Sequence, residues 1–276
     1  MTAYAKRSIL YWLLLGPFAI VALFPYAVML STAVKPGDEI FVFPPTWVPS
    51  RLAFENFVEM WTATGFGQAL LNSVLISLAG TIISLLVAIP AAYAMARLRW
   101  HGQGIYRQFL LVTQMLSPIV LVIGIFRLMA AMGLVDSQWA LILGYAAFNL
   151  AFATWMMSSY FKTIPKEIEE AAWIDGATRF QSLMRVFLPM ALPALAVTAI
   201  FTFINCWNEF VLALTILRSN EKYTLTLQIF TLVGGAYKIN WHHVMAATFA
   251  ATVPVAVVFA LMQRALVKGL SLGSVK

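Results

Sequence analysis

The chain has 276 residues, of which 62% are hydrophobic and 11% charged, and its mean hydropathy is +0.84. Soluble domains carry roughly 25% charged residues, so this chain lacks the charge to cover a water-facing surface and is predicted to be an integral membrane protein. The net charge of +7 does not indicate nucleic-acid binding, because the basic residues are spread between apolar runs rather than gathered in one patch.

Taken in chain order, the apolar runs predict an all-α membrane protein with six transmembrane helices, since one crossing needs about 20 residues. The first run is too long for the core of a signal peptide, roughly 7–15 residues, and is expected to remain as a helix. The six predicted helices cover residues 9–33, 68–95, 105–130, 138–160, 186–217 and 243–266.

The loops carry basic residues unequally. With the N-terminus inside, 12 of the 18 Lys and Arg residues fall in inside segments. The positive-inside rule then places both termini in the cytoplasm. We expect residues 1–67 to hold the first helix and an external loop, which Pro44, Pro45 and Pro49 keep free of helix. A membrane core is expected at 68–267, followed by a cytoplasmic tail at 268–276.

The loop between the fourth and fifth helices is unusually patterned. Pro165 suits a first helical turn, and Lys166–Asp175 is predicted to be a short helix that ends at Gly176. Ile168, Ala171 and Ala172 are expected on one face, where alanine permits close approach by another surface. Thr178 and Gln181 have the spacing of a capping box for a second helix that leads into the fifth span. The pattern also fits an ordinary amphipathic connector that lies on the membrane.

The fifth span carries a polar stripe, and polar groups within a span usually face a cavity or another helix. Two interpretations are open: the stripe lines a path for a polar solute, or Glu209 pairs with a neighbouring helix or subunit. Asn149 in the fourth span is a further candidate for the path. The stripe consists of Thr198, Thr202, Asn205 and Glu209, with Asn208 beside it.

The sequence offers no catalytic constellation and no metal site. No nucleophile–base pair is evident, and His101, His242 and His243 fall in loops predicted on opposite sides of the membrane. The phosphate-binding pattern G-x-x-x-x-G-K-[ST] is also absent. The chain is therefore predicted not to be an enzyme and to bind no cofactor, so that any ATP is handled by another polypeptide.

One gapped pattern resembles the EAA motif of ABC-importer permeases, with valine where isoleucine is usual. Segments 93–102, 206–214 and 266–276 are also similar to carbohydrate permeases, and together they resemble the second permease subunit of a maltose-type importer. The pattern is Glu170-Ala171-Ala172, three residues, Gly176, nine residues, then Val186-x-Leu188-Pro189.

This resemblance implies a type I ABC importer permease fold in a bacterial inner membrane. It implies that segment 165–185 forms the coupling helices that dock on an ATPase, with Glu170 and Gly176 as key residues and Ala171 and Ala172 at the contact. The implied partners are a homologous permease, an external solute-binding protein and two ATPase subunits that hold ATP and Mg. The alternative is a secondary transporter driven by an ion gradient, which needs charged residues near the midplane and has Glu209 as its main candidate.

Overall fold

The computed structural model describes residues 3–234 and 239–272, and every regular element within them is helical. The predicted all-α class is therefore confirmed. Met1–Gly67 with Gln228–Pro254 form one compact unit, and Gln68–Leu227 with Val255–Lys276 form a second. In chain order the helices are α1 (Ala3–Ala33), α2 (Glu55–Ala63), α3 (Phe66–Arg97), α4 (Gln103–Met115), α5 (Pro118–Ala131), α6 (Gln138–Phe161), α7 (Lys166–Ile174), α8 (Arg179–Ser182), the π-helix η1 (Leu183–Phe187), α9 (Leu188–Met190), α10 (Leu192–Asn208), α11 (Val211–Ile216), the 3₁₀-helix η2 (Asn220–Lys222), α12 (Leu225–Gly234) and α13 (Trp241–Leu272).

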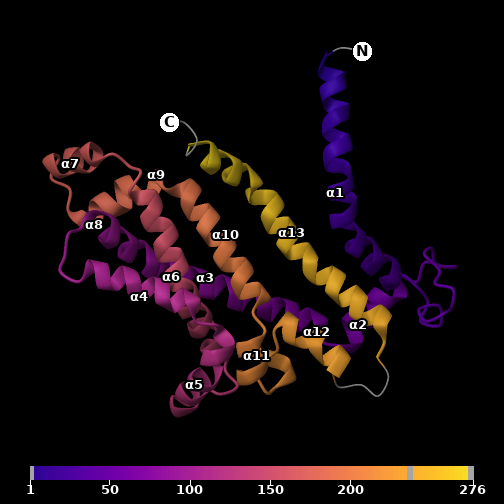
Figure 1. The fold of residues 1–276 in the computed structure, drawn as a ribbon. Helices are drawn as coiled ribbons and strands as arrows, with labels where there is room; N and C mark the ends of the chain where they lie inside the picture. The colour runs from indigo at the N-terminus through magenta and orange to yellow at the C-terminus, as the bar shows by residue number, and fades with distance from the viewer. Residues whose placement is uncertain (1–2, 235–238, 273–276) are drawn as a thin grey trace. The chain divides into compact units, whose positions relative to one another are not determined.

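Helix α6 is the central element of the second unit, where it packs against α10 and α4 (Figure 1). Helix α3 approaches α6 and α10 closely at Gly80. A Cβ atom added there would stand 3.3 Å from the Tyr145 Cβ and 3.5 Å from the Cys206 Sγ. A glycine at this crossing lets the helices approach closely enough for side chains on all three to share one apolar core.

Two large apolar clusters, beside a smaller one of Met95, Leu110 and Ala151, hold the second unit together. One of them joins α3 and α6 to η1 through edge-to-face contacts of Phe187 with Tyr93 and with Phe161, whose ring centroids lie 5.2 and 5.7 Å away. Such aromatic pairs favour one relative orientation of the elements that carry them. The other cluster joins α3, α6, α10 and α11 through buried side chains that include Ile76, Ile142, Tyr145, Cys206, Leu212 and Ile216.

The predicted third span is not one straight helix. Helix α4 ends at Met115, α5 begins at Pro118, and the two axes differ by 101°. Leu116 and Ser117 between them are extended. Because the ring of a proline disfavours helical backbone at the preceding residue, Pro118 explains why the helix breaks here.

The predicted fifth span, 186–217, is also wrong as a single helix. The short helices α8, η1 and α9 form one segment that is bent by 81° from α10, with Pro189 and Pro193 on either side of the bend. Helix α10 then ends at Asn208, and Glu209 is extended before α11 begins. The capped loop helix therefore turns sharply instead of leading straight into the span.

The number of crossings agrees with the prediction when broken helices are counted. In the described part of the chain, four helices are long and apolar enough to cross a membrane, and each bent pair can supply one more, which gives up to six. The sixth helix is longer than predicted, since α13 continues to Leu272. The last part of the predicted tail, residues 273–276, lies outside the described residues.

The first unit contains α1, α2 and the start of α13. Helix α1 leaves large apolar side chains such as Trp12, Phe18 and Ile20 exposed along its length, as expected of a helix that lipid or another protein covers. Residues 34–54 contain no helix, as the prolines predict, whereas α2 was not predicted. Asn56 ties this loop to α1, because its Nδ2 donates to the carbonyl oxygens of Ala33 at 2.9 Å and Lys35 at 2.8 Å.

Candidate functional site

Helix α7 ends in a compact hydrogen-bonded turn at Gly176. The Gly176 N–H donates to the Trp173 carbonyl at 3.0 Å, and the Ala177 N–H donates to the Ala172 carbonyl at 2.9 Å. Gly176 has φ +84°, a left-handed conformation that suits glycine because it has no Cβ. The predicted helix end is confirmed, although Pro165 stands just before the first helical residue rather than within the first turn.

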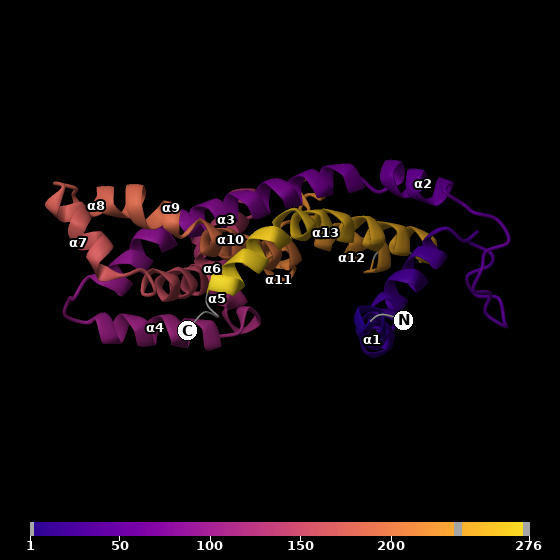
Figure 2. The same ribbon diagram turned by 90° about the horizontal axis from the view of Figure 1, so that it is seen from above.

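Helix α8 begins with the capping box that the sequence predicted. The Thr178 Oγ1 accepts a hydrogen bond from the Gln181 N–H at 3.3 Å, and the Gln181 Oε1 accepts one from the Thr178 N–H at 2.8 Å. The end of α7 and the start of α8 are thus both closed by hydrogen bonds, with Ala177 between them. A joint of this kind holds the two helices at a defined angle. Figures 1 and 2 show α7 and α8 at one end of the second unit, away from α11.

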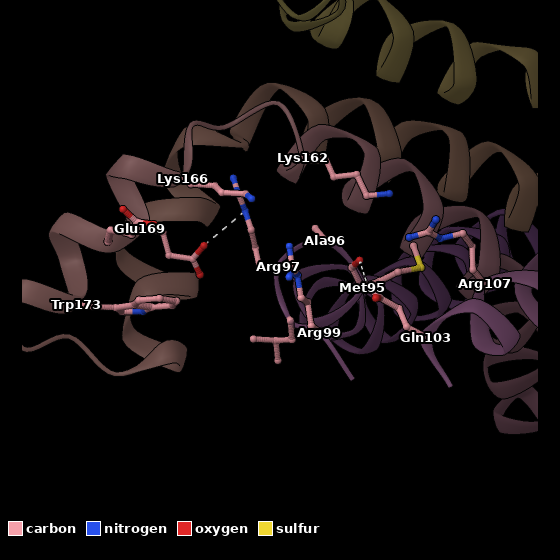
Figure 3. A pocket seen from close by; sticks show the side chains of 12 residues that line it. Met95, Ala96, Arg97, Arg99, Gln103, Arg107, Lys162, Lys166, Glu169 and Trp173 are labelled. Carbon is pink, nitrogen blue, oxygen red and sulfur yellow. Dashed lines mark hydrogen bonds and ion pairs between the residues drawn. The ribbon is translucent and has the colours of Figure 1, made fainter. Parts of the chain in front are cut away.

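Glu169 fixes α7 to the helices of the membrane core. Its side chain is 5% exposed, and its carboxylate accepts a hydrogen bond from the Tyr93 hydroxyl at 2.5 Å. The Nε of Arg97, which is equally buried, lies 3.6 Å from a Glu169 oxygen (Figure 3). A buried carboxylate needs such partners, because burial without them costs several kcal/mol.

Arg97 connects several elements at once. Its guanidinium donates to the carbonyl of Phe161, the last residue of α6, at 2.8 Å and to the carbonyl of Ile164 in the loop that follows. It also lies 4.8 Å from the centre of the Phe187 ring. Sequence reasoning missed both Arg97 and Glu169 as a pair. One local feature of the sequence could have indicated the position of Glu169. It is adjacent to the apolar Ile168, which packs against the core, so Glu169 lies near the inward side of α7.

The outward side of α7 carries the residues of the EAA pattern. Glu170, Ala171 and Gly176 are exposed, and Ala172 is half-buried. The predicted common face is therefore split, because Ile168 points into the core while Ala171 does not. Exposed apolar side chains adjoin this face, including Trp173, Ile174, Phe180 and Met184. Together these side chains form a partly apolar surface suited to contact with another protein.

Part of the predicted polar stripe lines a cavity of about 290 Å³ in the second unit. The Asn205 Nδ2 donates to the Asn149 Oδ1 at 3.2 Å, and the Asn149 Nδ2 donates to the Tyr145 carbonyl at 2.9 Å. Asn149, Asn205 and Glu209, three of the six polar residues considered for the path, therefore share one cavity. Its lining consists of Pro118, Tyr145, Phe148, Asn149, Asn205, Cys206 and Glu209.

The other stripe residues lie elsewhere. Thr202 is fully buried, and Asn208 is exposed, and neither lines the cavity. Thr198 is also buried, and its hydroxyl donates to the Ala194 carbonyl at 2.8 Å. Helical spacing places Thr198 and Thr202 on the stripe side of α10, which packs against α6, whereas Asn208 lies beside the stripe.

Glu209 has a structural role within its own chain. Its carboxylate accepts hydrogen bonds from the backbone N–H groups of Leu212 at 2.8 Å and Ala213 at 3.4 Å. It therefore caps the first turn of α11, where unpaired N–H groups attract a negative charge. The same side chain contributes to the cavity wall, so its two predicted uses are compatible. Across residues 3–234 and 239–272, no group of three or more His, Cys, Asp or Glu side chains is placed to hold a metal ion.

The chain is similar to transport permeases over nearly its whole length. It is 33% identical to the inner membrane ABC transporter permease protein YcjP of Escherichia coli, with 95% of this chain and 94% of the relative covered. It is also 33% identical to the trehalose transport system permease protein SugB of Mycobacterium tuberculosis, with 98% of each covered. A solved bacterial ABC transporter involved in alginate import matches with a TM-score of 0.80 and 26% identity, covering 96% of this chain and 98% of that chain.

These comparisons agree with the resemblance found in the sequence. They give no support to the secondary-transporter alternative. Residues 84–272 match the family described as the binding-protein-dependent transport system inner membrane component, and this segment includes α6, α7 and α10. The chain therefore belongs to this family and is a multi-pass permease of the inner membrane.

Proposed function

We propose that this permease carries a carbohydrate into the cell as part of an ATP-driven importer. Support comes from relatives whose names refer to trehalose and to trehalose/maltose, and from a structural neighbour that imports alginate. A homologous permease would complete the path, and an external solute-binding protein would deliver the sugar. The chain itself would catalyse no reaction, and ATP and Mg would be bound by two partner ATPase subunits.

The coupling site in this proposal is the joint between α7 and α8. The single observation that carries it is the anchoring of α7 by Glu169, which leaves Glu170 and Ala171 exposed on the opposite side. An ATPase bound to the exposed side would move α7, and the Glu169–Arg97 pair would transmit that movement to α3 and α6. Closure of the ATPase dimer would then shift the population of the path towards its outward-open form.

The proposed orientation places both termini and the α7–α8 joint in the cytoplasm. The distribution of basic residues supports this, with 12 of 18 Lys and Arg on that side. In the same orientation, the helix-free segment 34–54 and α2 face the outside, where a solute-binding protein would arrive. Residues 1–67, proposed to hold the first membrane helix and an external loop, precede the proposed membrane core.

Substitution of Glu170 or Gly176 tests the coupling site. We expect Glu170→Ala and Gly176→Ala to leave ATP hydrolysis measurable but to lower sugar uptake per ATP by about tenfold, because the contact that transmits force is lost. The measurement is sugar uptake and ATP hydrolysis by the complete transporter in proteoliposomes. Glu167→Ala is the matched control, since Glu167 is an exposed acid on the same helix. Unchanged uptake per ATP in both variants would rule out the coupling assignment.

The cavity at Asn149 and Asn205 is the proposed contribution of this chain to the path. Amide groups hydrogen-bond well to sugar hydroxyls, and Tyr145 and Phe148 add aromatic surface. We expect Asn205→Ala to weaken sugar-stimulated transport by several-fold, whereas Asn208→Ala, three residues along the same helix but outside the cavity, changes it little. Equal effects of the two substitutions in an uptake assay would exclude this cavity from the path.

A further inference from the structure

A second cavity, of about 400 Å³, lies where α3 and α6 end (Figure 3). We call it the basic cavity. It contains none of the residues that line the Asn149–Asn205 cavity. Its walls come from the last turn of α3, from α4, from the end of α6 and from α7. Its basic side chains are Arg97, Arg99, Arg107, Lys162 and Lys166.

The charges around the basic cavity do not balance. Five basic and two acidic side chains line it, a net of three positive charges. Arg97 is already neutralised by Glu169, and Glu170 is the one remaining acid of the lining. Figure 3 shows Arg107 and Lys162 on the opposite side of the cavity from Glu169. The excess positive charge therefore lies where no carboxylate of the lining is near.

Four of the basic side chains have no partner among the described residues. Arg99, Arg107, Lys162 and Lys166 form no ion pair and donate no side-chain hydrogen bond there, and the Nε of Arg107 is buried without an acceptor. Burial and the nearby charge of Arg107 lower the pKa of Lys162. Arg99, Lys162 and Lys166 are exposed, whereas Arg107 is half-buried. The like charges of Lys162 and Arg107 repel each other, and an anion bound between them would relieve this repulsion.

Two simpler explanations account for only part of this arrangement. Cations at helix C-termini compensate the helix dipole, but Arg97 already does so by donating to carbonyl oxygens at the end of α6. Cytoplasmic Lys and Arg residues also direct membrane insertion, but that role depends on their number and not on a shared cavity. Neither explanation calls for a buried guanidinium nitrogen without an acceptor at Arg107.

The depth of the basic cavity indicates which anion reaches it. Two apolar spans, Phe66–Arg97 and Gln138–Phe161, end at its edge, so it lies at the boundary between hydrocarbon and water. Phosphate groups of lipids occupy this level, and phosphate esters in the cytosol reach it from the other side. Guanidinium and ammonium groups are the usual protein ligands of phosphate.

We propose that the basic cavity binds a phosphate group, with Arg107 and Lys162 as its main ligands. The group belongs either to the headgroup of an anionic lipid or to a small soluble phosphate ester. A bound phosphate bridges α4 and the end of α6 and lies beside Lys166 of α7. This inference does not depend on which solute is transported.

The test uses the complete transporter, with Arg107→Gln compared with Arg185→Gln. Arg185 is an exposed arginine outside the cavity, so the control removes the same charge. Native mass spectrometry measures retention of phosphatidylglycerol against phosphatidylcholine from mixed nanodiscs. Calorimetry measures binding of inorganic phosphate and of glycerol phosphate in phosphatidylcholine nanodiscs. Where Arg107→Gln fails to assemble by size-exclusion chromatography, Lys162→Gln takes its place.

A loss of about fivefold or more in phosphatidylglycerol retention, confined to the cavity variant, assigns the site to a lipid headgroup. A similar loss confined to the soluble phosphates assigns it to a soluble ester. Either result supports the proposal. Absence of anion binding in the unmodified transporter, or equal losses in the cavity variant and the Arg185 control, overturns it.

Discussion

Two adjacent glutamates on α7 face opposite environments, which gives them separable roles. Glu169→Gln removes the negative charge that faces Arg97, whose side chain is 5% exposed, and leaves the guanidinium without its counter-charge. We expect a loss of about 1–3 kcal/mol in the free energy of unfolding. Glu170→Gln, at an exposed site, is expected to have no such effect. Apparent melting temperatures of the purified variants measure the difference, and equal values would contradict the anchoring role of Glu169.

Asp136 joins two loops of the second unit. Its carboxylate accepts hydrogen bonds from the backbone N–H groups of Arg218 at 2.9 Å and Ser219 at 3.0 Å, and it pairs with Lys222 at 2.9 Å. Hydrogen bonds from Ser219 and Lys222, followed by those from the backbone, lower the pKa of Asp136. The folded state therefore favours the ionised carboxylate.

This shift predicts a pH dependence. Because the folded pKa is the lower one, the stabilisation is fully present above the unfolded value of about 3.9 and is lost as the pH falls below it towards the folded pKa. We expect Asp136→Asn, which keeps the positive φ of 57° acceptable, to lower the melting temperature by a constant amount between about pH 5 and 8. The difference should shrink below about pH 4. A difference in melting temperature that does not change with acidification would show that the ionised carboxylate of Asp136 makes no stabilising contact.

At the scale of single residues, the sequence predicts which residue types form caps and turns better than it predicts which side of a helix is buried. The EAA pattern predicts that Glu170 and Gly176 are coupling residues, which stays a prediction, and the capping box at Thr178 is present as predicted. The sequence pattern did not distinguish Glu169, whose side chain is buried, from Glu170, whose side chain is exposed. That distinction depends on contacts of Glu169 with Tyr93 and Arg97, which lie far from it in the sequence. Tyr93, for example, precedes Glu169 by 76 residues.

At the scale of helices, the crossing of α3 with α6 depends on Gly80. The Cβ of any larger residue would already lie 3.3 Å from the Tyr145 Cβ, so a branched side chain forces the helices apart. We expect Gly80→Val to cost about 1–3 kcal/mol in stability, a usual range for overpacking. Gly124→Val in α5 is the matched control, because a Cβ there meets nothing within 4 Å. Thermal unfolding of both variants provides the comparison, and equal melting temperatures would exclude a tight crossing.

Apolar run length was sufficient to predict that these helices exist but not where they bend. Residues 105–130 and 186–217 are apolar throughout most of their length, yet both contain breaks. Pro118 explains the first break through its effect on the backbone of Ser117. The predicted fifth helix breaks twice. Pro189 and Pro193 flank the first of these breaks, the 81° bend before α10. The break after Asn208 needs three-dimensional information, because Glu209 stabilises it by bonding to N–H groups that α11 presents only once folded.

At the scale of the whole molecule, exposure differs greatly between spans. In the most apolar stretch of α1 no residue is buried within the chain. In the corresponding stretch of α6, 61% of the residues are buried. Composition alone predicted both as membrane helices, since lipid-facing and buried helices have similar sequences in a bilayer. Helix α6 is therefore a scaffold for its own chain, and α1 presents a surface to lipid or to the second permease.

Arg97 also constrains how this permease can be recombined with its relatives. A chimaera that takes residues 165–190 from another permease replaces Glu169 and Phe187 but keeps Arg97, which contacts both. The donor segment must therefore present a carboxylate and an aromatic ring at the same two places. Donors chosen for their exposed side alone would leave the buried Arg97 guanidinium without a carboxylate partner, so the buried side of the exchanged segment decides whether it is compatible with the rest of the chain.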